Sequence, residues 1–323
     1  MKRRTFLVSA AAIAGGVAAP WLAGVALRRE PRDVAIPPAT PRSAAVVWFS
    51  QTGHTRRIGR LVAHRWRAAG LDVLASDYRE CDPALVAARD LVLAGTPVNY
   101  YEAPGHFRAW LDALPPLHGR RCAAFATFGG PGDNAFNAAA GLLGGLARRG
   151  ALPLDVACLG NMSTFAPTWS LGNEARTLAY RHLPDAGTFD AARRFADGVL
   201  RRAVEGRGTD AAPSWNAREV LKGGVSVRGT RMLIGAHAVD PGACIGCDDC
   251  VRGCPVGAVA AGTRVVDDDR CVVCLGCVNN CPTGAMGMRF LGRPVVGFRR
   301  FLEGHGIRIA EPPELADGNR RGI

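Results

Sequence analysis

The sequence contains almost no lysine and few aromatic residues. Of its 40 lysine and arginine residues only Lys2 and Lys222 are lysine, and Phe, Trp and Tyr make up 7% of the 323 residues. A nucleic-acid-binding surface combines clustered basic residues with aromatic side chains, whereas the arginines here are scattered along the chain. We therefore expect no nucleic-acid partner, although the net charge of +12 could still attract an acidic partner protein.

Several catalytic and nucleotide-binding motifs are also missing. The sequence has no G-K-[ST] after a glycine-rich loop and no G-x-G-x-x-G, which argues against a nucleotide P-loop and a dinucleotide fingerprint. It has no H-E-x-x-H motif, no nucleophile elbow, no Ser-His-Asp arrangement and no pair of carboxylates suited to acid–base catalysis. We therefore predict no catalytic residue.

Cysteine, in contrast, is concentrated in one stretch. Eight of the eleven cysteines lie between residues 244 and 281, where the spacing C-x₂-C-x₂-C-x₃-C-P occurs twice. Thiolates are soft ligands that suit iron and sulfide. Zinc and disulfides are the alternatives, but zinc sites usually take pairs of C-x₂-C and do not account for triplets followed by C-P. The spacing therefore favours iron–sulfur clusters.

This stretch resembles the bacterial two-cluster ferredoxins over about fifty residues. The resemblance implies two [4Fe–4S] clusters, each bound by three cysteines of one repeat and the fourth cysteine of the other. The expected ligands are Cys244, Cys247, Cys250 and Cys281 for the first cluster, and Cys271, Cys274, Cys277 and Cys254 for the second. Gly246 and Gly276 are expected at tight bends between ligands. Asp248 stands where many relatives carry glycine, and its carboxylate is expected to lower the potential of the first cluster.

Residues 1–29 are expected to be a targeting segment. A basic start is followed by a mostly apolar run from residue 6 to residue 27, and the sequence R-R-T-F-L at residues 3–7 resembles the core of a twin-arginine export signal. This predicts an exported protein, in the periplasm or on the outer face of the cytoplasmic membrane. The alternative is an uncleaved anchor that tethers the protein to the membrane, because the run is long enough to span a bilayer. Four prolines predict an extended linker over residues 30–42.

Strands and helices are predicted to alternate between residues 43 and 205. Apolar runs predict strands at residues 44–49, 71–75, 91–97, 122–127 and 154–159. Helices are predicted at residues 56–69, 104–114, 135–149 and 188–204. The alternation predicts a parallel sheet covered by helices on both faces. Cys122 and Cys158 fall in two of the strands and are expected to be buried, as is Trp48.

The first predicted strand leads into a hydroxyl-rich loop at a helix N-terminus, a setting that favours a bound phosphate. The loop, S-Q-T-G-H-T, resembles the flavodoxin phosphate loop T/S-x-T-G-x-T. The resemblance implies a flavodoxin-like, doubly wound α/β fold with strand order 2-1-3-4-5 and FMN at the carboxyl ends of the strands. The expected phosphate-binding residues are Ser50, Gln51, Thr52, Gly53, His54 and Thr55.

Two further loops at the same edge are expected to contact the flavin ring. The first comprises Thr96, Pro97, Asn99, Tyr100 and Tyr101. One of its tyrosines would stack on the ring, although both could instead pack on the adjacent helix. The second comprises Thr127, Phe128, Gly129 and Gly130. The side chain of His54 is expected in solvent, with only its backbone near the phosphate.

The rest of the chain is divided into a linker over residues 206–239, a cluster domain over residues 240–290 and a tail over residues 291–323. The linker is predicted to have a hinge at residues 206–214 and a short helix at residues 215–222. Residues 289–302 are expected to pack on the cluster domain rather than on a membrane. Residues 303–323 are polar, contain proline and are expected to be mobile.

These predictions describe a fused flavodoxin-like and two-cluster ferredoxin protein. Flavin takes two electrons in single steps and each cluster moves one, so holding all three centres in one chain favours transfer among them. The predicted function is that of an exported electron carrier between redox partner proteins. Two alternatives are an FMN-dependent reductase of quinones or other small acceptors, and a redox- or iron-responsive module that signals by cluster loss.

Overall fold

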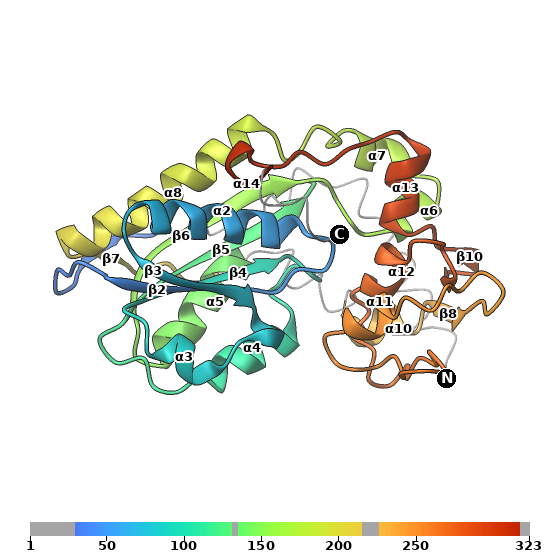
Figure 1. Ribbon diagram of the computed structural model, residues 1–323, viewed down its shortest axis with the longest axis horizontal. Helices are drawn as coiled ribbons and strands as arrows, with labels where there is room; N and C mark the ends of the chain where they lie inside the picture. Colours follow the sequence, from blue (N-terminus) through green and yellow to red (C-terminus); the bar gives the residue numbers. More distant parts are fainter. Residues whose placement is uncertain (1–29, 131–134, 215–225, 317–323) are drawn as a thin grey trace.

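The computed structural model describes residues 30–130, 135–214 and 226–316. Figure 1 shows two halves side by side: an α/β half built from residues 30–214 and a cysteine-rich half built from residues 226–304. The predicted export segment, the predicted helix at residues 215–222 and the last seven residues lie outside the described residues. Across the described residues, no helix combines the length and hydrophobicity needed to cross a membrane.

The α/β half is organised around a five-stranded parallel sheet. Its strands are β2 (Ser43–Trp48), β3 (Asp72–Asp77), β4 (Leu91–Pro97), β5 (Arg121–Gly129) and β6 (Leu152–Asn161). Their order in the sheet is β3-β2-β4-β5-β6. Numbered along the chain, this is 2-1-3-4-5, the order of flavodoxin-like sheets. The predicted fold class is therefore confirmed.

Helices cover both faces of this sheet, which is why its central strands are apolar throughout. The helices α2 (His54–Ala68) and α8 (Ala186–Glu205) pack on one face, and α4 (Gly105–Asp112) and α5 (Ala135–Arg148) on the other. The short helix α3 (Pro83–Ala87) and the 3₁₀ turn η1 (Tyr78–Glu80) connect β3 to β4. Gly59 of α2 lies so close to Trp48 that an added Cβ would stand 2.4 Å from the indole ring. Helix and strand therefore meet at van der Waals distance there.

Two expectations about buried side chains have different outcomes. Trp48 and Cys122 are buried as predicted. Cys158 is exposed, so that prediction is wrong. The reason is its place on β6, which is an edge strand of the sheet and is less covered than β5.

The segments at the two ends of the α/β half pair with each other. Strand β1 (Asp33–Ala35) runs antiparallel to β7 (Arg207–Thr209). Arg202 and Arg207 both form ion pairs with Asp33, at 2.7 and 2.5 Å. Residues predicted as a linker and a hinge thus include a small two-stranded sheet, because proline-free segments of both could exchange backbone hydrogen bonds.

The cysteine-rich half contains a second, antiparallel sheet. Its strands are β8 (Ile234–Val239), β9 (Met286–Phe290) and β10 (Arg293–Pro294), in the order β10-β9-β8. Three short helices accompany it: α10 (Val227–Arg231), α11 (Asp249–Arg252) and α12 (Gly276–Asn280). The small α+β domain expected after the parallel sheet is therefore present.

Two segments of the chain cross from one half to the other. After β6 the chain forms α6 (Pro167–Ser170) and α7 (Glu174–Leu178), which lie against α13 (Phe298–Gly304) (Figure 1). Trp169 donates a hydrogen bond from Nε1 to the carbonyl of Val296 at 2.8 Å and stacks on Phe301. Met162, Ala166 and Trp169 belong to the same buried cluster as the apolar residues around the cysteines. The hydrophobic core around the cysteines therefore includes the segment of the α/β half that follows β6.

The C-terminal segment returns to the α/β half. It ends in α14 (Pro313–Ala316), beside α2 and α8 in Figure 1. Leu315 is buried in the core cluster formed under those helices. Glu311 pairs with Arg57 at 2.5 Å, and Glu314 pairs with Arg193 at 2.7 Å. The prediction of a mobile tail is thus wrong for its described part, because one buried leucine and two ion pairs hold it.

Candidate cofactor sites

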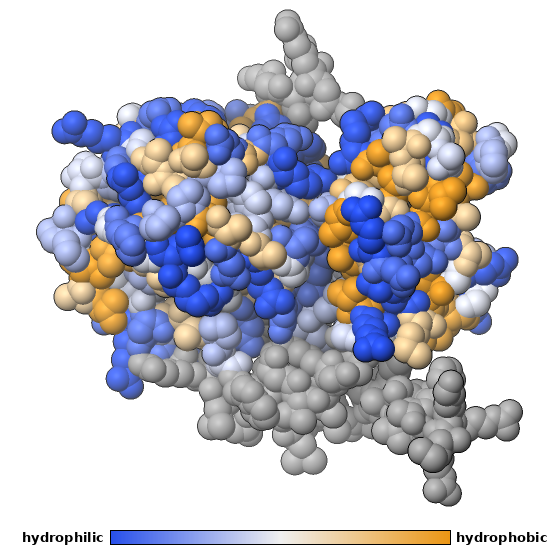
Figure 2. Space-filling view, turned by 90° about the horizontal axis from the view of Figure 1, so that it is seen from below, coloured by the Kyte–Doolittle hydropathy of each residue, from blue (hydrophilic) through white to orange (hydrophobic). Residues whose placement is uncertain are grey.

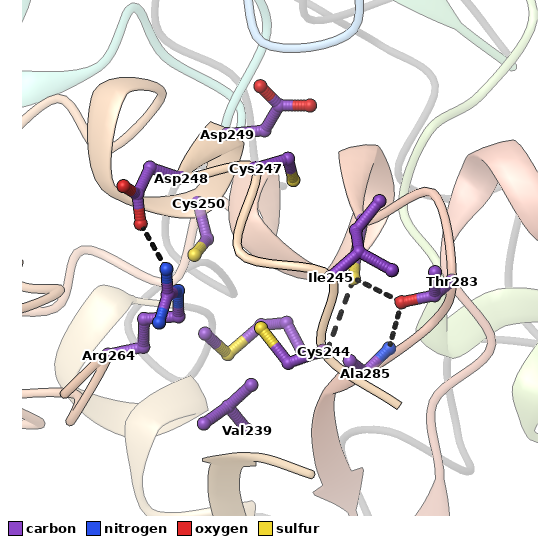
Figure 3. Close-up of a pocket in the computed structure, with 12 residues that line it drawn as sticks. Val239, Cys244, Ile245, Cys247, Asp248, Asp249, Cys250, Arg264, Thr283 and Ala285 are labelled. Carbon is purple, nitrogen blue, oxygen red and sulfur yellow. Dashed lines mark hydrogen bonds and ion pairs between the residues drawn. The ribbon is translucent and has the colours of Figure 1, made fainter. Parts of the chain in front are cut away.

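The eight cysteines of the repeat surround two cavities. The first cavity is lined by the thiols of Cys244, Cys247, Cys250 and Cys281, and the second by those of Cys254, Cys271, Cys274 and Cys277. Each cavity thus takes three cysteines from one repeat and the fourth from the other, the grouping that the resemblance to ferredoxins implies. Figure 3 shows the side chains around the first cavity, with Arg264 and Asp248 paired at its rim.

The two cysteine loops have the same backbone path. Gly246 and Val273 hold equivalent positions with φ of 75° and 51°, and Asp248 and Leu275 are equivalent with φ of 59° and 64°. In both repeats the left-handed residue directly precedes a short helix, α11 or α12. The left-handed conformation explains why glycine is expected at position 248, since glycine adopts it without steric cost.

Backbone and side-chain groups point at several of the sulfur atoms. The N–H of Ala258 donates to Cys254 Sγ at 3.1 Å, and the N–H of Met286 donates to Cys281 Sγ at 3.3 Å. His237 Nε2 lies 3.3 Å from Cys277 Sγ. Donors aimed at sulfur stabilise the negative charge of a thiolate, so this setting suits cysteines that bind a cluster.

Burial changes the acidity of the thiols. It raises the pKa of Cys274 to about 11 and raises that of Cys277 well above its usual range. The pKa of Cys281 is lowered, because hydrogen bonds from Met286 and Thr283 outweigh the opposing effect of burial. Cys274 and Cys277 are therefore protonated before a metal binds, and loading a cluster must release their protons.

The arrangement of the thiols bears on the alternatives of zinc and disulfides. No disulfide joins any of the eleven cysteines, all of which lie in described residues. In the described ranges, no group of three or more His, Cys, Asp or Glu side chains is arranged around a single metal ion. Zinc would need four ligands within about 2.3 Å of one point. The thiols around each cavity therefore fit a cluster better than they fit a single zinc ion.

Two charged or polar residues at these cavities were not predicted to take part. Arg264 Nη2 forms an ion pair with Asp248 Oδ1 at 2.7 Å, so the carboxylate that was expected to lower the potential of the first cluster has its charge balanced. His237, on β8, lies beside Cys277 although 40 residues separate them. Neither residue belongs to the cysteine repeat, and only the folded chain brings them to the cavities.

At the other candidate site, the loop before α2 has the shape of an anion cradle. Gly53 is left-handed, with φ of 93°, and an added Cβ would meet no atom nearer than 3.7 Å. The buried atoms Ser50 Oγ, His54 Nε2 and Asn161 Oδ1 have no hydrogen-bond partner within the described ranges. Buried polar atoms are normally hydrogen-bonded. The unpartnered Ser50 hydroxyl, which can donate, lies beside an open glycine turn at a helix N-terminus and therefore fits a bound phosphate group.

Two residues of this loop are fixed by neighbouring elements. Thr55 Oγ1 hydrogen-bonds Thr127 Oγ1 of β5 at 2.8 Å, and both side chains are buried. His54 is 6% exposed and lies edge-on to Phe298, so the expectation of a solvated side chain is wrong. Burial, assisted by the charge of Arg57, lowers the pKa of His54 to about 3. The imidazole is neutral at physiological pH, because α13 covers the start of α2.

The two loops expected to contact the ring lie at the same edge of the sheet. Thr96 is fully buried, Pro97 ends β4, and Asn99 forms an isolated bridge with Glu102. Tyr100 and Tyr101 are left-handed; Tyr101 is 39% exposed, whereas Tyr100 donates a hydrogen bond to the carbonyl of Val273 at 3.0 Å. Tyr100 thus packs against a cysteine loop, not against the adjacent helix.

In the other ring loop, Phe128 is half-buried and follows the buried Thr127. Gly129 packs so tightly on Ser163 that an added Cβ would lie 2.3 Å from its Cα, whereas Gly130 has open space around it and a φ of 106°. Gln51 and Thr52, the middle of the phosphate loop, are half-buried. The three loops therefore converge at the carboxyl edge of the sheet, as the order of the strands requires.

Residues 243–285 match the family model of the 4Fe-4S dicluster domain. The cysteine-rich half is therefore a ferredoxin-type iron–sulfur domain, and electron transfer is the function that it supports. No curated protein is significantly similar to the chain.

Several solved structures, flavodoxins among them, are similar to about half of the chain. A flavodoxin from the domain Archaea is 15% identical, with a TM-score of 0.37, over 50% of this chain and 98% of that one. A flavodoxin from Streptococcus pneumoniae is 19% identical, with a TM-score of 0.38, over 50% and 99%. Rubredoxin oxygen:oxidoreductase from Desulfovibrio gigas is 16% identical, with a TM-score of 0.39, over 51% and 36%. The flavodoxin-like assignment rests on the strand order and not on these distant likenesses.

Proposed function

We propose that the chain is an exported electron-transfer protein that passes electrons between FMN, two [4Fe–4S] clusters and partner oxidoreductases. The cysteines of the first cavity would hold one cluster and those of the second cavity the other. The loops at residues 50–55, 96–101 and 127–130 would hold FMN. When bound, FMN supplies the capacity for two electrons, and each cluster moves one electron at a time.

One observation carries this proposal: Tyr100, in a loop expected to flank the flavin, donates a hydrogen bond to Val273, which lies between two cysteines of the second cavity. The two kinds of candidate site are therefore neighbours in the folded chain. The unpartnered Ser50 Oγ supports a phosphate in the loop, which a module without flavin would not need.

The roles of the chain's own residues follow from their positions. The N-terminus of α2 and the turn at Gly53 would bind and orient the phosphate. Trp169, Phe298 and Phe301 pack together where α6 meets α13 and exclude water from that contact. The N–H groups of Ala258 and Met286 would stabilise the charge on the cluster ligands.

The experiment is anaerobic purification of the full chain, followed by measurement of iron, sulfide and flavin per chain. We expect about eight iron atoms and one FMN. Two variants separate the halves. Cys271→Ala should lose about half of the iron and keep flavin. Gly53→Val should lose flavin and keep iron, because valine strains the left-handed turn.

Zinc in place of iron would contradict the cluster assignment. A protein that stays free of flavin after reconstitution would contradict the FMN assignment. Rapid turnover of a small quinone by the loaded protein would point instead to a reductase.

Export and the partners are part of the same proposal. The twin-arginine pair at residues 3 and 4 supports export in the folded state, and the net charge of +12 supports an acidic partner. Replacing both arginines by lysine should leave the protein in the cytoplasm, and unchanged export would contradict the route.

A further inference from the structure

The two cysteine cavities are placed differently with respect to the α/β half. The loop of the second cavity lies directly on it, through the hydrogen bond from Tyr100 to Val273. Helix α12, which continues this loop, is also in contact: Asn280 Nδ2, at the end of α12 and just before Cys281 of the first cavity, donates to the carbonyl of Gln51 at 2.8 Å. Asn279 Nδ2 lies 3.2 Å from Gln51 Oε1 and 3.0 Å from the carbonyl of Thr164. Gln51 belongs to the phosphate loop, so the second cavity and the candidate FMN site share a contact residue.

A third contact reaches the remaining cysteine of the second cavity. Arg79, just after β3, donates from Nη1 to the carbonyl of Gly253 at 2.9 Å. Gly253 directly precedes Cys254, which lines the second cavity. Residues that follow β3 and β4, and the phosphate loop itself, therefore all contact the cysteine-rich half near the second cavity.

Gly276 shows how close the approach is. An added Cβ at this position would stand 3.1 Å from Gln51 Cγ and 3.6 Å from Cys274 Sγ. Any side chain would thus lie between Gln51 and a cysteine of the second cavity. The equivalent position of the first repeat is Asp249, the first residue of α11, as Gly276 is of α12. The cysteine loop itself therefore tolerates a side chain there, and the glycine is explained by the contact with Gln51.

The first cavity has a more open rim. Ile245, which lines it, is 66% exposed, and the three residues that follow Val239 are also exposed. Figure 2 shows apolar side chains gathered over the ferredoxin-type domain, and the exposed apolar residues of this domain include Met232, Ile245 and Val265. Through Ile245, the first cavity therefore has an apolar, accessible edge of the kind at which protein partners dock.

We infer that the two clusters have separate roles: the cluster of the second cavity exchanges electrons with the flavin across Gly276, Gln51 and Tyr100, and the cluster of the first cavity exchanges them with the external partner. This inference rests on the proposed function. Each electron that a one-electron donor gives up would pass from the first cluster to the second and then to the flavin. Two such passages, with protons from water, reduce the flavin by two electrons, and the reverse sequence oxidises it.

The test uses the full chain loaded with iron and FMN. The bound flavin is photoreduced, and its reoxidation by the clusters is followed optically. In Gly276→Ala the added methyl group separates Gln51 from Cys274, so reoxidation should slow several-fold while iron and flavin contents stay the same. In the matched variant Asp249→Ala the rate should stay at the wild-type value. Equal rates in the two variants would overturn the inference.

A second comparison covers the case in which Gly276→Ala fails to fold. Cys271→Ala and Cys247→Ala each remove one cluster, from the second and the first cavity respectively. Flavin reoxidation should be slower in Cys271→Ala than in Cys247→Ala by about tenfold or more, equivalent to about 1.4 kcal/mol in the barrier. The opposite order, or equal rates, would overturn the inference. Failure of the proposed function is distinguished by the wild-type protein, which would then lack iron or flavin.

Discussion

His54, the first residue of α2, has a neutral imidazole that is buried against Phe298. Its pKa is lowered from 6.5 to about 3, so between these values the unfolded chain binds a proton that the folded chain does not. This contribution to stability is complete above about pH 6.5 and is lost as the pH falls. It should remove about 2 kcal/mol from the free energy of unfolding at pH 5 relative to pH 8.

His54→Gln should abolish that part of the pH dependence, measured by denaturant unfolding at the two pH values. His64→Gln is the matched control, since His64 is exposed on the same helix. Acid effects on the clusters are common to both variants and cancel in the comparison. If the difference in the free energy of unfolding between the two pH values were unchanged in His54→Gln, this imidazole would not be held neutral.

The hydroxyl pair of Thr55 and Thr127 gives a second prediction for single residues. Both side chains are buried, and their oxygens are 2.8 Å apart. Thr127→Val leaves the Thr55 hydroxyl without its partner and should lower the free energy of unfolding by about 1–3 kcal/mol. The double variant Thr55→Val/Thr127→Val should cost less than the sum of the two single variants. Additive costs in this double-mutant cycle would mean that the pair contributes no coupling energy.

Helices α2 and α5 should differ in how replacement of a glycine by alanine changes the stability of the protein. Gly59→Ala in α2 improves helix propensity but drives a methyl group into Trp48. It should destabilise the protein by about 1–3 kcal/mol. Gly141→Ala in α5 meets no atom within 4 Å and should stabilise it by about 0.5–1 kcal/mol. Thermal or denaturant unfolding of both variants checks the opposite signs, and destabilisation by Gly141→Ala would contradict the account.

The elements of the parallel sheet could be predicted because their signals are local. Leu91–Pro97 is an apolar run that forms β4 at the predicted bounds, and Gly150 follows α5 as the predicted stop. The short elements escaped prediction: α6, α7, β8 and β9 have little periodicity of their own. They exist because side chains such as Trp169 and Phe290 share one core with distant residues. Tertiary contacts of this kind cannot be found from a short window of sequence.

At the scale of the whole molecule, the shared core should couple the halves. Trp169→Ala removes the stacking on Phe301 and the hydrogen bond to Val296, at a cost of about 3–5 kcal/mol. Native-state hydrogen exchange should then speed up both in residues 160–178 and in residues 286–301. Trp110→Ala, within the α/β half, is the control and should leave exchange in residues 286–301 unchanged. Faster exchange on one side only in Trp169→Ala would contradict a common core.

The candidate sites could be predicted to different depths. The cysteine spacing can be read directly from the sequence. The repeat, together with the family it resembles, therefore predicts which cysteines line each cavity. The contact between Gln51 and Gly276 spans more than 200 residues and no repeat marks it. The same holds for His54, whose burial depends on Phe298 at the far end of the chain.

The chain passes between the halves more than once, through α6 and α7 and again on its way to α14. A protease that cuts the exposed connection at residues 212–213 would therefore release nothing. The N-terminal fragment would keep Trp169 packed against α13, and the C-terminal fragment would keep Leu315 buried beneath α8. These contacts would hold the two fragments together. The nicked protein should migrate as a single species until a denaturant parts the two pieces.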